Sequence, residues 1–538
     1  MGDRRVVVVT GGGAGIGAAI AEELGRQGDF VVTMDPLVTL DGSEQLPPAE
    51  ETTAGRIVAA GGEAQASAVS VTDREAVADL LAGLVADHGR LDAVINVAGI
   101  TRSTSFATGT EADWAGVLTV HLEGYLNVLA AALPLMAAAG AGRVLGVTSG
   151  SGWRPADAGA YACAKRAVAA LTWTLGPLAP AGVTVNALSP IAVTRMVIEA
   201  ARKARERAAT GAAGPTSGGM SFGRMPEPHE IGPVAAHLVG NDTSWCQGRV
   251  VFAGGSEVAV VEPPRVLEAV RTGGVGSLAT VLDAIVPKAF ATAEAQQLSG
   301  GGSNPRFSAV FTEPPGEAGP SDVGSCLVVS DRHALASALA GALAARAVHC
   351  TAVDAASVGA DFAGAAGCLS GAGAVDAVVV AMDGPSRASG GEGWEQVLAE
   401  HAGLPGQLLG DAAWARAVAD RAAETSRPMR LLTVTDARTA GGRSRAQAVA
   451  QLARVARAAT EDRVSMFAVS SEAGDDTGVS ELAAHLLCAP DAAALSGAEL
   501  VAGAGWVGVR SHPRPAGSIT LGGTEIPDWF DTTLRGML

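Results

Sequence analysis

The 538-residue sequence contains very little tyrosine and lysine. Its two tyrosines are Tyr125 and Tyr161, and its three lysines are Lys165, Lys203 and Lys288. Acidic residues exceed basic ones, which gives a formal net charge of −17. A chain so poor in cations is disfavoured as a binder of nucleic acid or of an anionic membrane. We therefore expect a small-molecule enzyme with neither kind of partner.

Cysteine pairs and long hydrophobic runs are also missing. The six cysteines are scattered without a CxxC pair, and the histidines do not cluster near them at metal-ligand spacing. We expect reduced thiols, a cytoplasmic location and no metal site. The apolar run at residues 6–9 stops at glycines after four residues, which is too short for a signal peptide. Residues 126–139 include Asn127 and Pro134 and fall short of a membrane span of about 20 residues, so we expect no transmembrane segment.

Short Val/Ile-rich runs alternate with Ala/Leu-rich segments of helical period in the first half of the chain. This alternation is typical of βαβ units around a parallel sheet. It predicts a complete α/β domain, a doubly wound parallel sheet of the Rossmann type, over residues 1–260. The clearest expected strands are residues 6–10, 30–34, 93–97, 142–148, 183–188 and 249–253.

The alternation resumes after an interruption. Residues 261–320 begin with Pro263-Pro264, show helical turns on either side of Pro287 and end in a stretch rich in Gly, Ser and Pro. We interpret them as a helical extension and linker. Residues 321–538 then look like a second, degenerate copy of the first domain, with expected strands at 326–330, 348–354, 375–382, 429–435, 464–470 and 499–509.

A glycine-rich segment follows the first strand and precedes a helix. Glycines at this point let the backbone approach a pyrophosphate, and the helix N-terminus offers free N–H groups to the anion. Asp35 ends the next strand, where a carboxylate can accept hydrogen bonds from both ribose hydroxyls and repel a 2′-phosphate. We therefore expect NAD (NADH) as cofactor, with NADP disfavoured.

Tyr161 and Lys165 lie four residues apart and hence on one face of a helix. The lysine can lower the pKa of the phenol and hold the nicotinamide ribose, which lets the phenol exchange a proton with a substrate oxygen. Few sequences so poor in both residue types would place them together by chance. The strand before this helix delivers Thr148, Ser149 and Ser151 at its carboxyl end, where a hydroxyl can bind the same oxygen.

Residues 5–260 resemble the short-chain dehydrogenase/reductase family. The motifs that carry the resemblance are TGGGAGIG at 10–17, NVAG at 96–99, Ser149, the Tyr161/Lys165 pair and SPIAVT at 189–194. The resemblance implies that Tyr161 is the general acid/base, Lys165 the ribose clamp and Ser149 the partner of the carbonyl oxygen. The cofactor contacts that it implies, together with those expected above, are Gly11, Gly15, Ile16, Gly17, Asp35, Val71, Asn96, Ala98, Gly99, Lys165, Ile191 and Thr194.

Four positions depart from the family pattern. Ser149 precedes Tyr161 by twelve residues where thirteen is usual, so Thr148 or Ser151 is an alternative, and we favour Ser149. His121 stands where a proton-relay asparagine is usual. The sequence leaves a relay role and ordinary core packing of this side chain equally open. Ile191 replaces a common glycine, and Ser70 replaces an aspartate that usually contacts adenine.

The segment from residue 191 to residue 228 is expected to cover the substrate as a lid. It carries Met196, Met220 and Phe222, which suit an acyl chain or ring system, and a basic group that suits phosphates of coenzyme A or an acyl carrier protein. That basic group consists of Arg195, Arg202, Lys203, Arg205 and Arg207. A solvated helix face and an ordinary packed lid are the alternatives.

The substrate class follows from a looser likeness. The VHLEG segment at 120–124 and the extension after residue 260 are similar to (3R)-hydroxyacyl-CoA dehydrogenase units. This likeness implies a secondary alcohol/ketone pair on a 3-hydroxyacyl/3-ketoacyl thioester. A polyketide-like or steroid-like ketone is the alternative substrate. The alternative to an enzymatic function is a non-catalytic scaffold role as a pseudoenzyme.

The second half contains neither tyrosine nor lysine, so residues 321–538 cannot hold a Tyr/Lys pair. Its first strand is followed by Asp331-Arg-His rather than glycines, which is too bulky for a pyrophosphate. We expect an internal pseudodimer, and also a homodimer, with residues 114–138 and 159–175 packed on residues 408–423 and 445–459.

Overall fold

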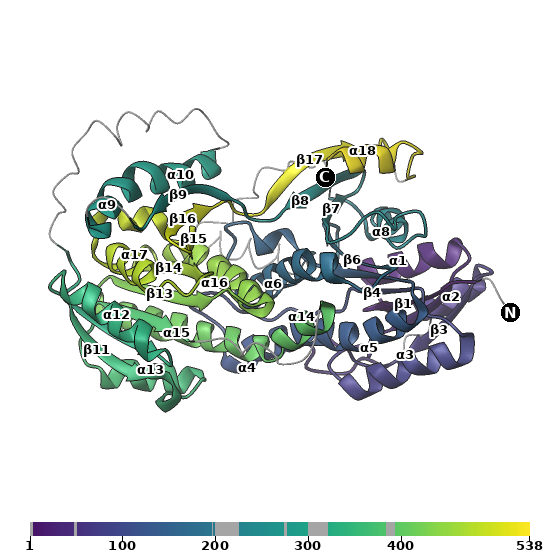
Figure 1. The fold of residues 1–538 in the computed structure, drawn as a ribbon. Helices are drawn as coiled ribbons and strands as arrows, with labels where there is room; N and C mark the ends of the chain where they lie inside the picture. The colour runs from purple at the N-terminus through teal and green to yellow at the C-terminus, as the bar shows by residue number, and fades with distance from the viewer. Residues whose placement is uncertain are drawn as a thin grey trace.

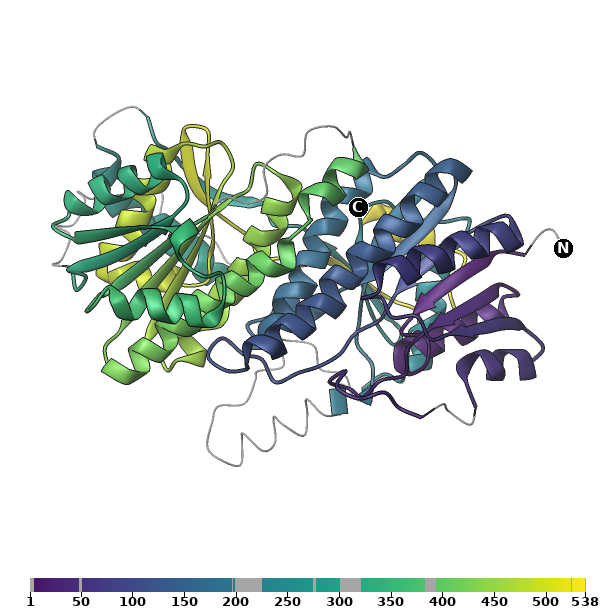
Figure 2. The same cartoon turned by 90° about the horizontal axis from the view of Figure 1, so that it is seen from below.

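The computed structural model describes residues 4–47, 51–195, 197–198, 225–273, 277–299, 321–382, 393–523 and 525–537. Within them the chain forms two β-sheets, each flanked by helices on both faces (Figures 1 and 2). The expected α/β fold of the doubly wound type is thereby confirmed.

The first sheet has nine strands in the order β17-β8-β7-β6-β5-β4-β1-β2-β3. Strands β1 to β7 are parallel, whereas β8 and β17 are antiparallel to their neighbours. Helices cover both faces, which is why β1 is apolar on both sides and fully buried. Its strands are β1 (Val6–Thr10), β2 (Phe30–Met34), β3 (Glu63–Ser67), β4 (Ala93–Asn96), β5 (Gly142–Val147), β6 (Val183–Pro190), β7 (Val250–Gly254), β8 (Glu257–Glu262) and β17 (Arg514–Thr520).

The second sheet has eight strands in the order β11-β10-β12-β13-β14-β15-β16-β9. Strands β10 to β15 are parallel, and β16 and β9 complete the sheet in antiparallel fashion. Its strands are β9 (Val266–Arg271), β10 (Ser325–Ser330), β11 (His349–Asp354), β12 (Ala377–Ala381), β13 (Met429–Asp436), β14 (Val464–Ser471), β15 (Glu499–Gly503) and β16 (Trp506–Arg510).

The helices divide between the two sheets. Those beside the first sheet are α1 (Gly15–Arg26), α2 (Thr53–Ala59), α3 (Arg74–His88), α4 (Glu111–Leu118), α5 (Gly124–Ala139), α6 (Gly159–Leu175), α8 (Gly232–Leu238) and α18 (Phe530–Gly536). Those beside the second are α9 (Leu278–Ile285), α10 (Ala291–Ser299), α12 (His333–Ala344), α13 (Phe362–Gly371), α14 (Trp394–Glu400), α15 (Leu404–Thr425), α16 (Ala440–Ala459) and α17 (Asp476–Cys488).

The two sheets exchange their last strands. β9 follows β8 in the sequence but pairs with β16 in the second sheet. β17 follows β16 but crosses to pair with β8 in the first sheet, where α18 also lies (Figure 1). Each exchanged strand is antiparallel to the strand that it joins. Strand pairing thus crosses the expected divisions at 260 and 320. The first sheet is completed by β17 from near the end of the chain, and the second sheet is completed by β9, which directly follows β8.

The halves also meet through helices. α6 packs along α16, and α4 packs on α15, as seen in Figure 2. One apolar cluster is continuous across this contact and includes Val168 and Leu171 of α6 together with Val449 and Leu452 of α16. The contact therefore involves the four segments that the sequence suggested.

One continuous helical stretch, Glu111–Ala139, is long and apolar enough by length and composition to cross a membrane. It consists of α4, a π-helical turn (Thr119–Glu123) and α5. Half of the most apolar 18-residue part of this stretch is buried inside the protein. Val117, Leu122 and Leu129 belong to the apolar core, so packing accounts for the apolar character of this stretch.

Candidate active site

The expected site residues come together at the carboxyl ends of five parallel strands. The glycine-rich loop follows β1, Asp35 follows β2, and Asn96 ends β4. Ser149 follows β5, and Ile191 follows β6. Strand order reverses between β1 and β4, and such a switch point is where open α/β sheets bind their ligands.

The glycine-rich loop has the geometry of an anion cradle. Gly11 has φ of 65°, and a Cβ there would lie 2.9 Å from the backbone of Ala98. A Cβ on Gly17 would lie 2.1 Å from the carbonyl oxygen of Gly11, so this glycine is needed for α1 to pack on the loop. α1 has no side-chain cap at Ala14, which leaves its first N–H groups available to a phosphate. The loop therefore fits a dinucleotide pyrophosphate.

The Asp35 carboxylate lies against this loop. Its Oδ2 accepts a hydrogen bond from the Gly13 N–H at 3.0 Å, and its Oδ1 accepts one from the Leu37 N–H at 2.8 Å. A Cβ on Gly13 would fill the space beside the carboxylate, at 2.8 Å from Oδ2. The negative charge is thus fixed at the carboxyl end of β2, where the ribose of a dinucleotide would lie.

The remaining expected cofactor residues surround the same opening. Asn96 is buried, and its Oδ1 accepts a hydrogen bond from Thr10, whose Oγ1 in turn accepts the Ala98 N–H. Thr194 comes near Gly15, since a Cβ there would lie 3.8 Å from the Thr194 methyl group. Ile16 and Ile191 are half-buried. Val71 is buried against Gly124 of α5, and its carbonyl oxygen accepts a hydrogen bond from Asn127 at 3.0 Å.

Tyr161, Lys165 and Ser149 form one cluster. The Lys165 ammonium lies 5.7 Å from the centre of the Tyr161 ring and donates a hydrogen bond to the Val147 carbonyl oxygen at 2.7 Å. The Ser149 hydroxyl lies close enough to the Tyr161 hydroxyl to lower the pKa of the phenol. Thr148 is occupied elsewhere, because its hydroxyl donates to the Lys165 carbonyl oxygen at 2.6 Å. Of the alternative hydroxyls, the structure brings that of Ser149 to Tyr161.

Burial shifts the proton affinities of this cluster. It raises the pKa of the Tyr161 phenol, whereas the nearby Ser149 hydroxyl lowers that pKa. It lowers the pKa of Lys165 to about 7, because an ammonium group is poorly solvated where only 3% of the residue is exposed. The two pKa values are thus moved apart, and the lysine is the member of the pair that changes charge near neutral pH.

His121 lies in the π-helical turn and directly beside the cluster. Its ring meets the Tyr161 ring edge-on at 5.0 Å between centroids, and a Cβ on Gly99 would lie 2.3 Å from its Cε1. Nε2 lies 2.7 Å from the Ile100 carbonyl oxygen, whereas Nδ1 is buried without a hydrogen-bond partner among the described residues. Burial, and secondarily the Lys165 charge, lowers the pKa of His121 to about 3, so the imidazole is neutral.

The lid and most of the basic group lie outside the described residues. This applies to Met196, Met220 and Phe222 and to Arg202, Lys203, Arg205 and Arg207. Arg195, at the start of that segment, is exposed.

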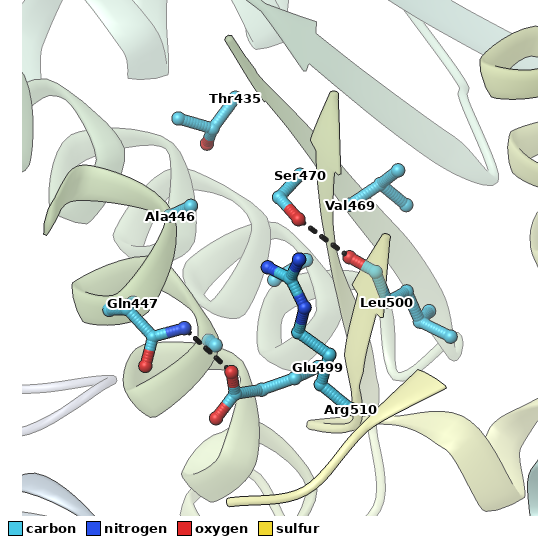
Figure 3. Close-up of a pocket in the computed structure, with 10 residues that line it drawn as sticks. Thr435, Ala446, Gln447, Val469, Ser470, Glu499, Leu500 and Arg510 are labelled. Atoms are coloured by element: carbon cyan, nitrogen blue, oxygen red, sulfur yellow. Dashed lines mark hydrogen bonds between the residues drawn. The ribbon is translucent and has the colours of Figure 1, made fainter. Parts of the chain in front are cut away.

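The corresponding region of the second half contains a small pocket between α16 and strands β13 to β15 (Figure 3). Several of its polar groups are already paired: Gln447 donates to Glu499 at 2.6 Å, and Ser470 donates to the Leu500 carbonyl oxygen at 3.2 Å. Nearby, an ion pair between Arg445 and Asp411 is almost fully buried. These lining groups include no tyrosine and no lysine.

Sequence reasoning missed Arg166, the neighbour of Lys165. Its guanidinium is completely buried and forms an ion pair with Glu499 of the second half. Glu499 is 333 residues away in the sequence, so no local pattern could have connected the two.

Comparison with known proteins agrees with the geometry. A family model described as short chain dehydrogenase matches residues 5–206. The chain is 34% identical to the short-chain reductase protein NovJ of Streptomyces niveus over 46% of this chain and 92% of NovJ. It is 28% identical to the 3-oxoacyl-[acyl-carrier-protein] reductase FabG of Thermotoga maritima over 47% of this chain and 98% of FabG.

A third similarity is to one part of a larger protein. The chain is 35% identical to the peroxisomal hydratase-dehydrogenase-epimerase of Saccharomyces cerevisiae over 36% of this chain and 21% of that protein. The matched family model, the reductase relatives and the cluster at the strand ends agree on one assignment. Through its first half, the chain belongs to the short-chain dehydrogenase/reductase family, whose members are oxidoreductases that bind a nicotinamide cofactor.

Proposed function

We propose that this protein interconverts a secondary alcohol and a ketone with NAD(H), using Tyr161 as general acid/base. The observation that carries the proposal is the cluster in which the Ser149 hydroxyl lies beside the Tyr161 hydroxyl and the Lys165 ammonium lies 5.7 Å from the centre of the tyrosine ring. The three groups are at the carboxyl edge of the sheet, on the side of the glycine-rich loop.

Bound NAD(H) supplies or accepts the hydride, and the protein's own groups handle the proton. In reduction, Tyr161 donates its phenol proton to the substrate oxygen while the Ser149 hydroxyl donates a hydrogen bond to the same atom. In oxidation, the phenolate takes the proton back. Lys165 favours the phenolate electrostatically and holds the nicotinamide ribose.

His121 is proposed as a proton-relay residue in its neutral form. Its Nε2 is held by the Ile100 carbonyl oxygen, and its Nδ1 has no partner among the described residues. With Nε2 donating to that carbonyl oxygen, Nδ1 is the nitrogen that can accept a hydrogen bond in the relay. Core packing against Gly99 is the alternative role for this side chain.

The preference for NAD over NADP is proposed on Asp35. A 2′-phosphate would be placed against a carboxylate that two backbone N–H groups hold in position. Two like charges at such a distance repel, and the glycine-rich loop at 10–17 contains no arginine or lysine to offset the repulsion.

The proposed substrate is a 3-ketoacyl thioester on coenzyme A or an acyl carrier protein. The similarity to FabG, named as an acyl-carrier-protein reductase, and to the dehydrogenase-containing yeast protein supports this class. A polyketide-like or steroid-like ketone is the alternative. We propose a cytoplasmic location, since the six cysteines are unpaired.

For the second half we propose a degenerate dehydrogenase domain that makes the chain an internal pseudodimer. The α6–α16 and α4–α15 contacts and the exchanged strands support this role. We propose a catalytic domain at 1–260, a helical extension and linker at 261–320 and a degenerate, non-catalytic domain at 321–538. Assembly into a homodimer remains a prediction, and it would need a surface other than these helices. A scaffold role for the whole chain is disfavoured by the intact cluster at Tyr161.

Fluorescence titration of the whole protein with NADH and with NADPH tests the proposal first. We expect NADH to bind at least about 10-fold more tightly, a difference of about 1.4 kcal/mol. Equal affinity would remove the NAD assignment, and binding of neither would remove the dehydrogenase proposal. The same protein is then screened for turnover of 3-ketoacyl thioesters and of cyclic and polyketide-like ketones.

Tyr161→Phe tests the chemical role. We expect kcat to fall by at least about 100-fold with unchanged NADH affinity, because only the exchangeable proton is lost. Tyr125→Phe is the matched control, since it removes the chain's other phenol hydroxyl, which is buried without a hydrogen-bond partner among the described residues. Full activity in Tyr161→Phe would contradict the proposal.

A further inference from the structure

The loop between β5 and α6, residues 149–158, carries Ser149 and leads into Tyr161. Four consecutive backbone carbonyl oxygens in this loop, at residues 151–154, accept hydrogen bonds from side chains. Backbone carbonyls in short loops are more commonly satisfied by the local backbone or by water. An uninterrupted row of side-chain donors therefore marks this loop as specifically held.

The donors for three of these carbonyls belong to α16 of the second half. Gln451 Nε2 donates to the Ser151 oxygen at 3.0 Å and to the Arg154 oxygen at 2.8 Å. The Arg454 guanidinium donates to the Trp153 oxygen. Gln447, Gln451 and Arg454 are spaced by four and then three residues, so they lie on one face of α16.

The fourth carbonyl is held indirectly by the same face. Arg166 donates to the Gly152 oxygen at 3.1 Å. The same nitrogen also donates to Gln451 at 3.4 Å, Nε donates to Gln447 at 3.0 Å, and Nη2 forms the buried ion pair with Glu499. Arg166, the residue of the first half that holds the loop, is therefore oriented by residues of the second half.

The held segment is directly coupled to the proposed catalytic groups. The Ser149 hydroxyl accepts the Ser151 N–H at 3.3 Å and lies close enough to the Tyr161 hydroxyl to lower the pKa of the phenol. The peptide carbonyl of Ser151 is the one that Gln451 binds. A displacement of this segment would therefore move Ser149 relative to Tyr161, and misplacement by about 1 Å can cost about 100-fold in rate.

We propose that the second half positions the Ser149 loop for catalysis, with Gln451 of α16 as the positioning residue. This inference rests on the proposed function of Ser149 and Tyr161. It gives the second half a part in the reaction although that half carries no reacting group. The second half then sets the geometry of the active site in the first half.

The test compares Gln451→Met with Gln447→Met in the full-length protein. Both glutamines lie on the same face of α16 and accept a hydrogen bond from Arg166, but Gln447 donates to Glu499 and not to the loop. Hydrogen–deuterium exchange of peptides spanning residues 149–158 measures whether the loop is held. Steady-state kinetics and NADH titration measure the consequence for the reaction.

For Gln451→Met we expect faster exchange in the loop, a kcat lower by about 10-fold and an unchanged NADH affinity. We also expect the pH at which alcohol oxidation reaches half its maximal rate to rise, because a Ser149 hydroxyl that moves away from Tyr161 no longer lowers the pKa of the phenol. Gln447→Met should keep the wild-type pH profile and a kcat within about twofold of wild type.

The possible outcomes distinguish failure of this inference from failure of the proposed dehydrogenase function. Unchanged loop exchange in Gln451→Met would overturn the inference, as would faster exchange with unchanged kcat and pH profile. Equal losses in both variants would reduce the role of α16 to general interface stability and would also overturn it. A wild-type protein that binds neither NADH nor NADPH would instead overturn the proposed function.

Discussion

At the scale of single residues, the site is built from groups whose burial is unfavourable for folding. Lys165 is 3% exposed, and within the described chain its ammonium has a backbone carbonyl oxygen as its hydrogen-bond partner and no carboxylate paired with it. Burying a charge without a counter-charge is costly unless the group loses its proton, which is why the pKa of Lys165 falls to about 7. The protein therefore keeps a destabilising residue where the proposed chemistry requires it.

Lys165→Met should raise the free energy of unfolding by about 2 kcal/mol at pH 7 while abolishing turnover. The wild-type penalty is full below the folded-state pKa of about 7, where the buried amine must be charged. It fades as the pH rises toward the unfolded-state pKa of about 10.4, because the unfolded chain then holds the extra proton. Urea unfolding of both proteins at pH 7 and pH 9.5 measures this gap, and a gap that widens with pH would contradict the argument.

His121 should act without a charge. Its pKa of about 3 means that no rate change near pH 6.5 should arise from this group between pH 5 and pH 8. His121→Asn keeps a donor for the Ile100 carbonyl oxygen and should retain activity within about 10-fold. His121→Leu leaves that buried oxygen unpaired and should cost about 1–3 kcal/mol of stability. Activity profiles and thermal unfolding distinguish the two variants, and a His-dependent inflection near pH 6.5 would refute the neutral assignment.

The sequence alone could predict those site residues that lie within one βα unit. Tyr161 and Lys165 are one helical turn apart, and the glycine loop and Asp35 follow adjacent strands, so local spacing determines their placement. The choice between Thr148 and Ser149 was different, because neighbouring residues at a strand end point in opposite directions. Gln451 could not be found at all, since its contact with Ser151 spans 300 residues.

At the scale of secondary-structure elements, the α6–α16 contact carries the most unusual energetics. Arg166 and Glu499 are an ion pair within a largely apolar interface, and both are at most 4% exposed. Desolvation lowers the pKa of Arg166 well below its usual value, although the adjacent carboxylate and amides hold the guanidinium in place. Such a pair contributes little net stability as a unit, but removing one member leaves a buried charge unpaired.

Arg166→Met and Glu499→Gln should each lower the free energy of unfolding by about 3–5 kcal/mol. The double variant should lose clearly less than the sum, because it leaves no uncompensated charge. Chemical denaturation of the four proteins completes this double-mutant cycle. Strictly additive losses would show that the two side chains do not act as a pair.

The elements that sequence reasoning missed share a physical cause. β3 reads Glu-Ala-Gln-Ala-Ser, which lacks the β-branched and aromatic residues that favour strands. β9 and β17 are antiparallel edge strands whose partners, β16 and β8, lie more than 200 residues away. Their pairing is decided by the completed sheet that they join, and not by their own sequence.

At the scale of the whole molecule, the exchanged strands make the two halves mutually dependent. The C-terminal segment buries Phe530 completely in the apolar cluster of the first half, where its ring meets that of His237 at 5.3 Å. The segment after β8 buries Phe290 completely in the cluster of the second half. Neither half, cut at residue 260 or 320, would keep its full core.

Reciprocal substitutions test this dependence. Phe530→Ala should cost about 3–5 kcal/mol and should speed hydrogen exchange in β7, β8 and α8 of the first half, although residue 530 lies near the far end of the sequence. Phe290→Ala should cost a similar amount and should speed exchange in α9 and α17 of the second half. Trp529→Ala is the matched control, because that neighbouring aromatic side chain is 47% exposed and should cost less than about 0.5 kcal/mol. If Phe530→Ala loosened only the second half, the strand exchange would not exist in solution, and the proposed support of the first half by the second would rest on the α6–α16 contact alone.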